Sequence, residues 1–315
     1  MATTKEIKNR IKSVKDTQKI TNAMYLISSA KMRKAKKEME ATKPYFELLK
    51  KEINRIFSVH EDVTGKYFSK GELEEKDDEC IGILVITADK GLAGAYNQNV
   101  IKEALGAIKR ASRYKLYVVG EYGRHYFMAH GYVIEQSFLY TAQNPSLDRA
   151  REIMDILLTE FNEGSISRMY ICYTDFKNSF TGGSAVGMRL LPFDKDEIAY
   201  SKEENEAHFT SSFEFEPSLE IVLDSIVPSY LAGFVYSALV ESFCSEQSAR
   251  MTAMDAANDN AEELLDVLSK EYNHVRQGAI TREITEISAG ARGQKISAEK
   301  RKKKKLEKKK ENEAI

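Results

Sequence analysis

The chain has 315 residues, of which 42% are hydrophobic and 30% are charged, so it can bury a substantial core and is not a disordered protein. Its formal net charge of -1 hides a strong segregation. Residues 1–37 hold 11 Lys and Arg against 2 acids, residues 295–310 hold 10 against 2, and residues 38–294 hold 26 against 42. Basic ends around an acidic middle bear on partners and association rather than on the fold.

The cysteines and the N-terminal sequence indicate a soluble protein of a reducing compartment. Cys80, Cys172 and Cys244 are odd in number and far apart, which fits neither a disulfide framework nor a zinc site. The N-terminus has no apolar signal core, and the longest apolar run, residues 230–240, is shorter than the roughly 18 residues of a membrane span. We therefore expect no direct transmembrane segment, although such a chain can still dock on a membrane complex.

Residues 1–58 are predicted to form one long N-terminal helix. Thr3 and Glu6 have the spacing of a capping box, in which each side chain bonds the backbone amide of the other residue. A stripe this narrow favours a coiled coil over an ordinary amphipathic surface helix, provided that a partner helix exists. The apolar residues of the stripe repeat at steps of three and four: Ile7, Ile11, Val14, Ile20, Met24 and Ile27.

The middle of the chain has the pattern of an α/β domain. Residues 59–79 are acidic and turn-rich and are predicted to be a linker. Between residues 80 and 217, runs of strand type alternate with helical stretches, which predicts a Rossmann-like, mostly parallel sheet. The strand candidates are residues 80–88, 114–121, 168–176 and 186–193, and the helices between them fall around 97–112 and 146–163.

A second long helix is predicted for residues 218–294. About sixty helical residues would extend ~90 Å, which is too long to lie wholly inside one compact domain. The N-terminal helix is the matching partner, and an antiparallel arrangement is the easier closure because the α/β domain separates the two. The expected fold class is α/β, with a long antiparallel coiled coil of the N- and C-terminal helices. The predicted seam is Met254, Ala257, Ala261, Leu264, Leu268, Tyr272, Val275 and Ala279.

Residues 295–315 form a lysine-rich tail that is predicted to be disordered or a fraying helical extension. A tail of this composition can bind nucleic acid, acidic lipid headgroups or an acidic protein face, so a nucleic-acid-binding coiled-coil protein is one alternative function. No aromatic residue is interleaved with the lysines, which argues against a specific binder of single strands. A solvated tail is the simpler interpretation.

The sequence offers no clear catalytic site. The segment ADKGLAGAYNQN, residues 88–99, lies between a predicted strand and helix but lacks both a Gly-Lys-Ser/Thr ending and a G-x-G-x-x-G motif. A tight turn that uses the positive φ of glycine is the simpler interpretation. The five histidines have no metal-ligand spacing, and no serine or cysteine lies in a nucleophile elbow. We expect no cofactor and no metal, with an oxidoreductase or other nucleotide-binding enzyme as the alternative.

Several segments resemble the gamma subunits of F-type ATP synthases, the family of central rotor shafts. The middle segment, ITADKGLAGAYNQNV, is similar to the family pattern Thr-x-Asp-Lys/Arg-Gly-Leu-x-Gly. Family chains generally stop soon after the last of these segments, whereas this chain continues for about two dozen residues that are rich in lysine. The segments that carry the resemblance are residues 6–24, 86–100, 215–217 with Tyr230, 245–264 and 272–291.

The resemblance implies a noncatalytic rotor subunit, present in one copy per complex. Such a rotor transmits torque between ion translocation in the membrane and ATP synthesis or hydrolysis at the beta subunits, and so regulates ATPase activity and ion flow. The implied partners are the alpha and beta subunits of the catalytic ring, the epsilon subunit and the membrane c-ring, with no nucleic acid. The implied location is the cytoplasmic face of the bacterial cell membrane, as a peripheral protein.

The resemblance also implies which residues contact the alpha/beta ring. Arg276, Gln277, Thr281 and Glu283 match positions that contact the catch loops of beta. Met24 and Arg250 match a pair near an acidic loop of beta, whose carboxylates a run of nearby basic residues could face. From the residues alone, a solvated flank of the coiled coil is the simpler interpretation of that run. Its members are Lys31, Arg33, Lys34, Lys36 and Lys37.

Overall fold

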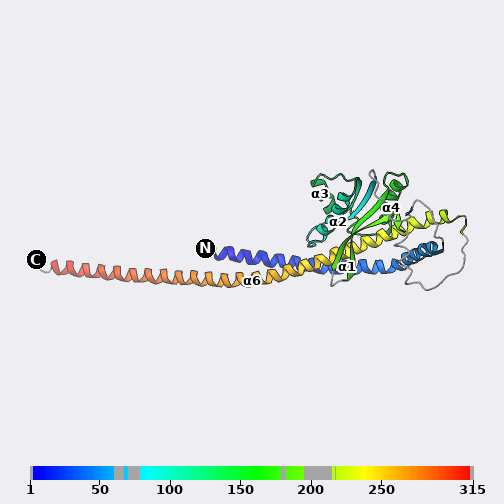
Figure 1. The fold of residues 1–315 in the computed structure, drawn as a ribbon. Coiled ribbons are helices and arrows are strands. Elements are labelled where there is room, and N and C mark those ends of the chain that lie inside the picture. Colours follow the sequence, from blue (N-terminus) through cyan, green and yellow to red (C-terminus); the bar gives the residue numbers. More distant parts are fainter. Residues whose placement is uncertain are drawn as a thin grey trace. The chain divides into compact units, whose positions relative to one another are not determined.

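The computed structural model of the chain describes residues 3–59, 67–69, 79–178, 182–194, 215–216 and 218–312 (Figure 1). The chain divides into two compact units. The terminal unit combines Met1–Asn22 with Ala256–Ile315, and the central unit is Ala23–Asp255. Two long helices, α1 (Thr4–Val59) and α6 (Leu219–Asn312), each contribute to both units.

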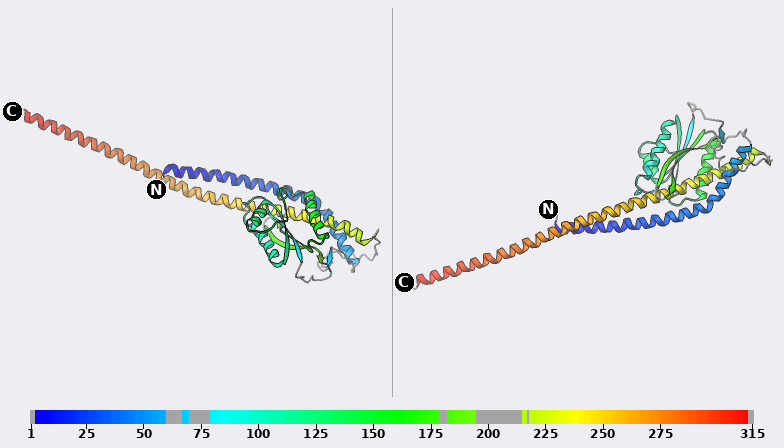
Figure 2. Two further views of the ribbon diagram at one scale, coloured as in Figure 1. Left: turned by 90° about the horizontal axis from the view of Figure 1, so that it is seen from above. Right: turned by 60° about the horizontal axis from the view of Figure 1, so that its bottom comes forward.

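The terminal unit is a pair of antiparallel helices, as the sequence predicts. The first residues of α1 lie beside α6 and run in the opposite direction (Figures 1 and 2). The Thr21 hydroxyl donates a hydrogen bond to Oδ1 of Asn258 across the pair. At equal rise per residue, counting back from Thr21 and forward from Asn258 places Ile7 opposite Tyr272. Ile7 is only 3% exposed, so the seam of the pair is closed almost to the start of α1.

The capping box predicted at the start of α1 is confirmed. The backbone amide of Thr3 donates to Oε2 of Glu6 at 2.8 Å, and the amide of Glu6 donates to the Thr3 hydroxyl at 3.3 Å. Both bonds satisfy amides that have no partner within the helix, so they fix where α1 begins.

The predicted stripe of α1 is right at its start and wrong further along. Ile20 and Ile27 are 61% and 55% exposed, so they lie outside the seam. The less exposed residues instead continue at strict steps of three and four from Val14 through polar side chains, because helix pairing follows the period rather than the hydrophobicity of each residue. This part of the seam is Gln18, Thr21, Tyr25 and Ser28.

The seam of α6 follows the predicted spacing with one change. Met254, Ala261 and Leu268 are buried, while Leu264 is 37% exposed and its neighbour Leu265 takes the half-buried position. After Ala279 every residue of α6 through residue 301 is exposed. The helix therefore continues past the start of α1 with no partner among the described residues.

The helix α6 also includes most of the tail for which the sequence predicts disorder. Its backbone is helical through Asn312, so the helical extension is the alternative that the structure shows. The tail contains no proline or glycine after Gly293 and is rich in lysine and glutamate, which are good helix formers.

The central unit contains a five-stranded sheet with the order β4-β3-β2-β5-β6. The first four strands are parallel and β6 is antiparallel to β5, which confirms the mostly parallel, Rossmann-like prediction. A separate parallel pair joins β1 (Phe68–Ser69) and β7 (Phe193–Asp194). The strands of the main sheet are β2 (Cys80–Ile86), β3 (Arg113–Val119), β4 (Gln136–Phe138), β5 (Arg168–Asn178) and β6 (Gly182–Leu191).

Helices cover both faces of the sheet (Figure 1). Alternate residues of β2 divide between the faces: Ile83 and Val85 pack in one core, and Leu84 and Ile86 in the other. The first core includes α2 (Tyr96–Arg110) and α3 (Glu121–Ala129). The second core includes α4 (Leu147–Asn162) together with the middle of α1 and the first third of α6. The long helices therefore form part of the hydrophobic core of the sheet.

Within the central unit, α1 and α6 are again antiparallel. Ile56 packs with Leu223, and Phe46 lies against Gly233, so the partner number on α6 rises as the number on α1 falls. A side chain at Gly233 would overlap the ring of Phe46, so glycine is what lets the two helices approach here. Close packing at Gly233 therefore accompanies the antiparallel pairing of α1 and α6 within the central unit.

The apolar part of α6 is accounted for by this packing. An 18-residue window of α6 has a mean hydropathy of 1.4, long and apolar enough by composition to cross a membrane, and 44% of it is buried. Unbroken apolar runs of the sequence do not reveal this window, because polar residues interrupt it. Core helices of globular proteins pass the same test, and Val235, Leu239 and Phe243 of α6 are buried in the sheet core.

The three cysteines are free thiols, and two of them are buried, Cys172 in the first core and Cys244 in the second. Burial raises the pKa of Cys172 to about 12 and that of Cys244 to about 11. Both groups therefore stay protonated and unreactive at neutral pH. The predicted linker, residues 59–79, lies outside the described residues except for Val59 at the end of α1, residues 67–69 and residue 79. The segment 195–214 also lies outside the described residues.

Candidate functional site: the junction between the sheet and helix α6

The loop that follows β2 is held in place by its own side chains. The Thr87 hydroxyl donates to the carbonyl of Val119 at 2.8 Å and accepts from the amide of Gly123 at 3.0 Å. Oδ1 of Asn97 accepts from the amide of Ala88 at 2.9 Å. These bonds tie the loop to β3, α2 and α3, so the segment that resembles a phosphate loop is a fixed structural turn.

Asp89 attaches the same loop to the start of α3. Its Oδ1 accepts from the amide of Glu121 at 3.0 Å, where the first amides of the helix have no partner within the helix. A carboxylate at this end also interacts favourably with the helix dipole. The loop and α3 are therefore fixed to each other through Asp89.

Arg250 of helix α6 is hydrogen-bonded to this loop. Nη1 of Arg250 donates to Oε1 of Glu246, one turn earlier on α6, at 2.5 Å. Nη2 of the same guanidinium donates to the carbonyls of Gly91 at 3.1 Å and Lys90 at 3.4 Å. The side chains of Arg250 and Glu246 are each 9% exposed, so the ion pair is largely removed from water. One buried cation thus bridges the helix and the loop.

A second set of contacts joins α6 to β5 and β6. The backbone amide of Thr174 on β5 donates to the Ser242 hydroxyl at 3.2 Å. A side chain at Gly183 of β6 would overlap the Ser245 hydroxyl, so glycine and serine let the strand and the helix approach closely. Burial raises the pKa of the Tyr96 hydroxyl, which lies beside Ser242, well above its usual value. Small polar side chains therefore face the sheet at this crossing.

These contacts place α6 where an open α/β sheet would bind a ligand. Such sheets bind ligands at the carboxyl ends of the strands, at the point where the strand order reverses. Here the chain runs outward from β2 to β3 and β4, then returns to the other side of β2 as β5, so the reversal lies between β2 and β5. Arg250 holds the loop after β2, and Ser242 bonds the later half of β5. The helix α6 therefore occupies the crevice that a nucleotide would need.

The turn after β3 packs closely against the loop after β2. A Cβ atom at Gly120 would overlap the carbonyl oxygen of Thr87, and the φ of Gly120 is +94°. The amide of Tyr122 donates to the carbonyl of Ala88 at 3.0 Å, so the turn after β3 packs directly on the loop after β2. The turn after β3 therefore leaves no gap beside the loop after β2. The helix in the crevice between β2 and β5 is what argues against the alternative of a dinucleotide-binding enzyme.

A small hollow of about 150 Å³ remains at the junction, open to water. Burial raises the pKa of Glu246 and the nearby Asp89 carboxylate adds to this, while Arg250 and Lys31 oppose the shift. The hollow is thus a place where charges of both signs meet at the edge of the core. Its lining is Met24, Ile27, Ser28, Lys31, Asp89, Lys90, Gln143, Phe243, Glu246, Gln247 and Arg250.

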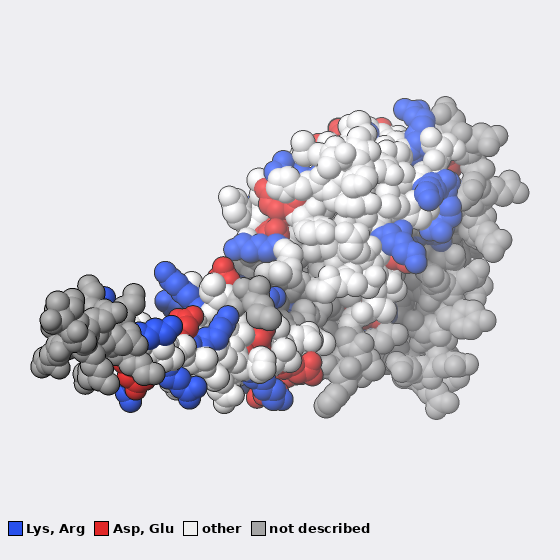
Figure 3. Space-filling view, turned by 90° about the vertical axis from the view of Figure 1, so that its left-hand side faces the viewer, with Lys and Arg blue, Asp and Glu red and all other residues white. Residues whose placement is uncertain are grey.

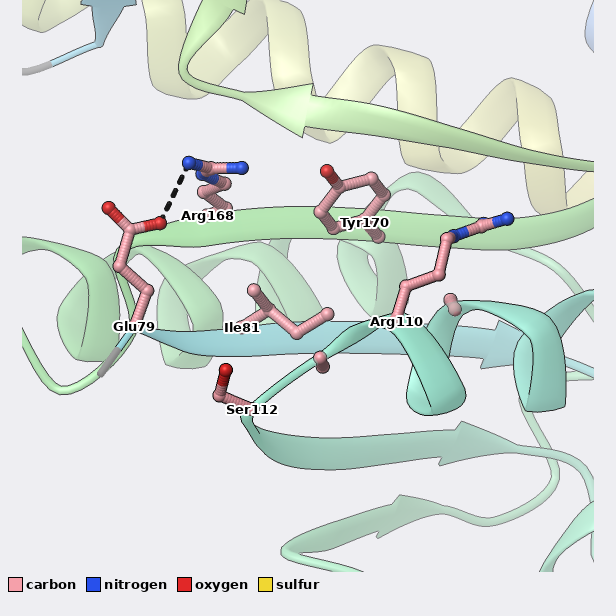
Figure 4. Close-up of a pocket in the computed structure, with 8 residues that line it drawn as sticks. Glu79, Ile81, Arg110, Ser112, Arg168 and Tyr170 are labelled. Atoms are coloured by element: carbon pink, nitrogen blue, oxygen red, sulfur yellow. Dashed lines mark ion pairs between the residues drawn. The ribbon is translucent and has the colours of Figure 1, made fainter. Parts of the chain in front are cut away.

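A second, smaller hollow of about 60 Å³ lies at the opposite edge of the sheet (Figure 4). It is lined at the amino ends of β2 and β5, with Arg168 paired to Glu79 at 2.9 Å and Arg110 beside Tyr170. Ligand sites of open α/β sheets lie at the carboxyl ends of the strands, so this hollow has the wrong position for one. In the described part of the chain, no group of three or more His, Cys, Asp or Glu side chains could hold a metal ion.

The predicted contact residues fall into two groups. Met24, Lys31 and Arg250 line the hollow at the junction of the central unit, although the guanidinium of Arg250 is engaged inside the chain. Arg33 is exposed on α1 in the same unit. The remaining four are exposed on the terminal part of α6, where no described residue covers them: Arg276, Gln277, Thr281 and Glu283.

Sequence reasoning did not identify Glu246, Ser242 or Asn97 as residues of this junction. Glu246 lies one turn before Arg250, and this spacing of opposite charges on a helix could have indicated an ion pair. Asn97 sits at the start of a predicted helix, but its bond to Ala88 depends on the loop geometry.

Known proteins agree with this architecture. A family model described as ATP synthase matches residues 3–293. The ATP synthase gamma chain of Caldanaerobacter subterraneus subsp. tengcongensis is 44% identical over 293 residues, which cover 91% of this chain and 98% of that one. The chain belongs to the ATP synthase gamma chain family. The gamma chain of Acetobacterium woodii, described as sodium ion specific, is 36% identical and covers 91% of this chain and 97% of its own length.

Solved structures show the same fold at lower identity. The rotor of the Euglena gracilis mitochondrial ATP synthase has a TM-score of 0.61 at 17% identity and covers 88% of this chain and 98% of that one. The central stalk and c-ring structure from Tetrahymena thermophila gives a TM-score of 0.53 at 23% identity, over 76% of this chain and 99% of that one. As a gamma chain, the protein is a noncatalytic subunit of an F-type ATP synthase, and its Rossmann-like sheet is a scaffold.

Proposed function

We propose that this gamma chain is the rotor that transmits torque between ion translocation in the membrane sector and ATP synthesis or hydrolysis at the beta subunits. Through this coupling it regulates ATPase activity and ion flow. One copy of the chain would bind the alpha and beta subunits of the ring, the epsilon subunit and the membrane c-ring. The complex would lie at the cytoplasmic face of a bacterial cell membrane.

The observation that carries this proposal is the unpartnered end of α6. Pairing with α1 ends near Ala279, and every described residue from Ile280 through Arg301 is exposed. Isolated helices are marginal in water, so a stretch of this length gains from a surrounding partner. A sleeve formed by the ring would supply one.

The surface of this end suits a contact that must form and break repeatedly. Ile280, Ile284 and Ile287 are 45%, 59% and 66% exposed and fall at steps of four and three, with charged and amide side chains between them. A thin apolar stripe among polar groups gives modest, reversible contacts, whereas a wide apolar face would hold one position tightly. We propose that Arg276, Gln277, Thr281 and Glu283 contact the ring here.

The central unit is proposed to contact the ring and the foot of the complex. Lys31 and Arg33 of α1 are exposed, and with Met24 they would face an acidic loop of beta. Charges of both signs are interspersed over the helices in Figure 3, while the face of the α/β domain turned toward the viewer is mostly uncharged. Uncharged surface of this kind suits packing against another subunit more than long-range electrostatic attraction.

Co-expression with the alpha and beta subunits tests the proposal. The chain should purify in one stoichiometric complex with ATPase activity. In that complex, Gln277→Ala and Thr281→Ala should each lower turnover or coupling several-fold without changing the yield of the subunit. Thr285→Ala is the matched control, because its hydroxyl bonds the carbonyl four residues earlier at 2.7 Å, just as that of Thr281 does at 2.9 Å.

Failure to enter such a complex would overturn the proposed function. Full activity in both the Gln277 and the Thr281 variants would overturn only the contact assignment. An equal loss of activity in the Thr285 control would show that the helix end as a whole is needed, and would overturn the specific roles of Gln277 and Thr281.

A further inference from the structure

We propose that Arg250 is a positioning residue that locks the loop of residues 89–94 to α6, so that the α/β sheet and the helix turn as one body. The role in coupling rests on the proposed function, whereas the lock itself is a property of this chain. The family resemblance implies that Arg250 contacts a partner, but its guanidinium is already engaged inside the chain.

The guanidinium uses both of its ends. Nη1 is bonded to Glu246 of α6, and Nη2 is bonded to the carbonyls of Lys90 and Gly91. A planar guanidinium can serve two directions at once, whereas a lysine ammonium is a single point charge. Arg250 is 8% exposed, so water does not compete strongly for these bonds. The residue therefore acts as a short rigid link between the helix and the loop.

The loop in turn is attached to the sheet and to a helix beside it. Thr87, directly before the loop, donates a hydrogen bond to the carbonyl of Val119 on β3 at 2.8 Å. Asp89 accepts a bond from the amide of Glu121 at the start of α3. A force on the sheet thus reaches α6 along hydrogen bonds that pass through the loop to Arg250.

Most other contacts between the sheet and α6 are not directional. Residues such as Val235 and Leu239 of α6 are buried in the core, and apolar contacts of this kind resist separation better than they resist sliding. The hydrogen bond between Ser242 and Thr174 is one directional contact, at 3.2 Å. Arg250 supplies another, eight residues further along the helix and on the loop of a different strand.

The conformation of the loop fits a restrained turn. Leu92, directly after the two carbonyls, has a φ of +63° and is 66% exposed. A non-glycine residue keeps such a conformation only when its surroundings impose it. The bonds from Arg250 on one side and the buried Ala93 on the other supply that restraint.

The lock is tested first by hydrogen exchange on the full chain. Arg250→Lys keeps a cation beside Glu246, so it leaves no unpaired buried carboxylate, but it removes the bridge to the loop. We expect the amides of Ala88, Tyr96 and Glu121 to exchange about tenfold faster in this variant, with no change for amides of β3. Arg124→Ala is the matched control, because it removes a guanidinium paired to Glu121 at 2.6 Å without touching α6.

The role in coupling is tested in the assembled enzyme in membrane vesicles. The measured quantity is ATP-driven ion pumping divided by ATP hydrolysis. Arg250→Lys and Arg250→Ala should lower this ratio about fivefold or more while hydrolysis continues, and Arg124→Ala should not change it. A loss of stability alone would lower the amount of complex but leave the ratio unchanged.

Unchanged exchange in Arg250→Lys, or equal acceleration in Arg124→Ala, would overturn the lock. Faster exchange with an unchanged pumping ratio would overturn the role in coupling. If the unmodified chain did not assemble with alpha and beta, the proposed function would fail while the exchange result still decided the lock.

Discussion

Glu241 illustrates how a single half-buried carboxyl makes the stability of this chain depend on pH. Its Oε1 accepts from the Ser237 hydroxyl at 3.0 Å. Burial raises the pKa of Glu241, and the charge of Asp175 adds to that shift. Between the ordinary value of 4.5 and the raised pKa, the folded chain binds a proton that the unfolded chain has lost. Stability from this group therefore falls as pH rises through that window.

We expect Glu241→Gln to stabilise the chain more at pH 7.5 than at pH 5. The amide keeps an acceptor for Ser237 and removes the buried charge, so the gain in melting temperature at pH 7.5 should be about 2 °C or more. Thermal unfolding of the full chain at both pH values measures this, with the exposed Glu262→Gln as control. An equal gain at the two pH values would contradict the assigned cause.

Two glycines of the same helix should respond in opposite directions to alanine. Gly233→Ala would push a methyl group into the ring of Phe46 and should lower the free energy of unfolding by about 1–3 kcal/mol. At Gly278 nothing lies within 4 Å of an added Cβ, so Gly278→Ala should raise it by up to about 1 kcal/mol through helix propensity. Chemical denaturation of the full chain measures both effects.

Phe46→Leu added to Gly233→Ala gives a further control for the clash. If the overlap with the ring causes the loss, the double variant should recover part of it. No recovery would place the cause elsewhere.

At the scale of single residues, the sequence identified the period of the helices better than the members of the seam. Ile20 and Ile27 are apolar and exposed, while Gln18 and Ser28 are polar and lie on the seam. An apolar residue is a signal of burial only on average, because surfaces of proteins also contain many apolar atoms. Which side of α1 meets α6 depends on the partner helix, and hydrophobicity along α1 alone does not contain that information.

Among the elements, the end of α6 is the part whose stability should differ most from the rest. Residues 280–301 are exposed throughout, whereas residues 238–248 are almost all buried. In the chain without partners, we expect amides of the exposed stretch to exchange about a hundredfold faster than those of the buried stretch. Hydrogen exchange with mass spectrometry measures both in one sample. Comparable protection of the two stretches would mean that the exposed end has found a partner, such as a second copy of the chain.

Most strands of the sheet and the helices α2 and α4 were predictable from the sequence, whereas α3, β4 and the crossing of α6 over the sheet were not. Alternation of β-branched runs with helical stretches predicts a mostly parallel sheet, as observed. The junction brings Arg250 to Gly91 across 159 positions of the chain, and no local pattern reports such a contact. A basic residue on a long helix is expected to be solvated until the tertiary structure is known.

At the scale of the whole molecule, the family match covers residues 3–293 and does not include the C-terminal segment that follows. The family match ends at residue 293, and an alignment that uses 91% of this chain covers 98% of the Caldanaerobacter gamma chain. The helical, lysine-rich segment after Gly293 is therefore an addition to the part shared with relatives. The shared part contains the pairing with α1, the junction with the sheet and the exposed end of α6.

We therefore expect a chain that ends at Gly293 to enter the complex with alpha and beta in the same stoichiometry, with ATPase activity within about twofold of the full chain. A chain that ends at Ala279 should lose most coupled activity, because it lacks the exposed end of α6 and with it Thr281 and Glu283. Pumping and hydrolysis of the three assembled forms measure this. A large loss on removing only the residues after Gly293 would place the tail in contact with a partner. If the full chain bound DNA in a salt-dependent way and the chain ending at Gly293 did not, nucleic-acid binding by the tail would gain the support that its composition alone does not give.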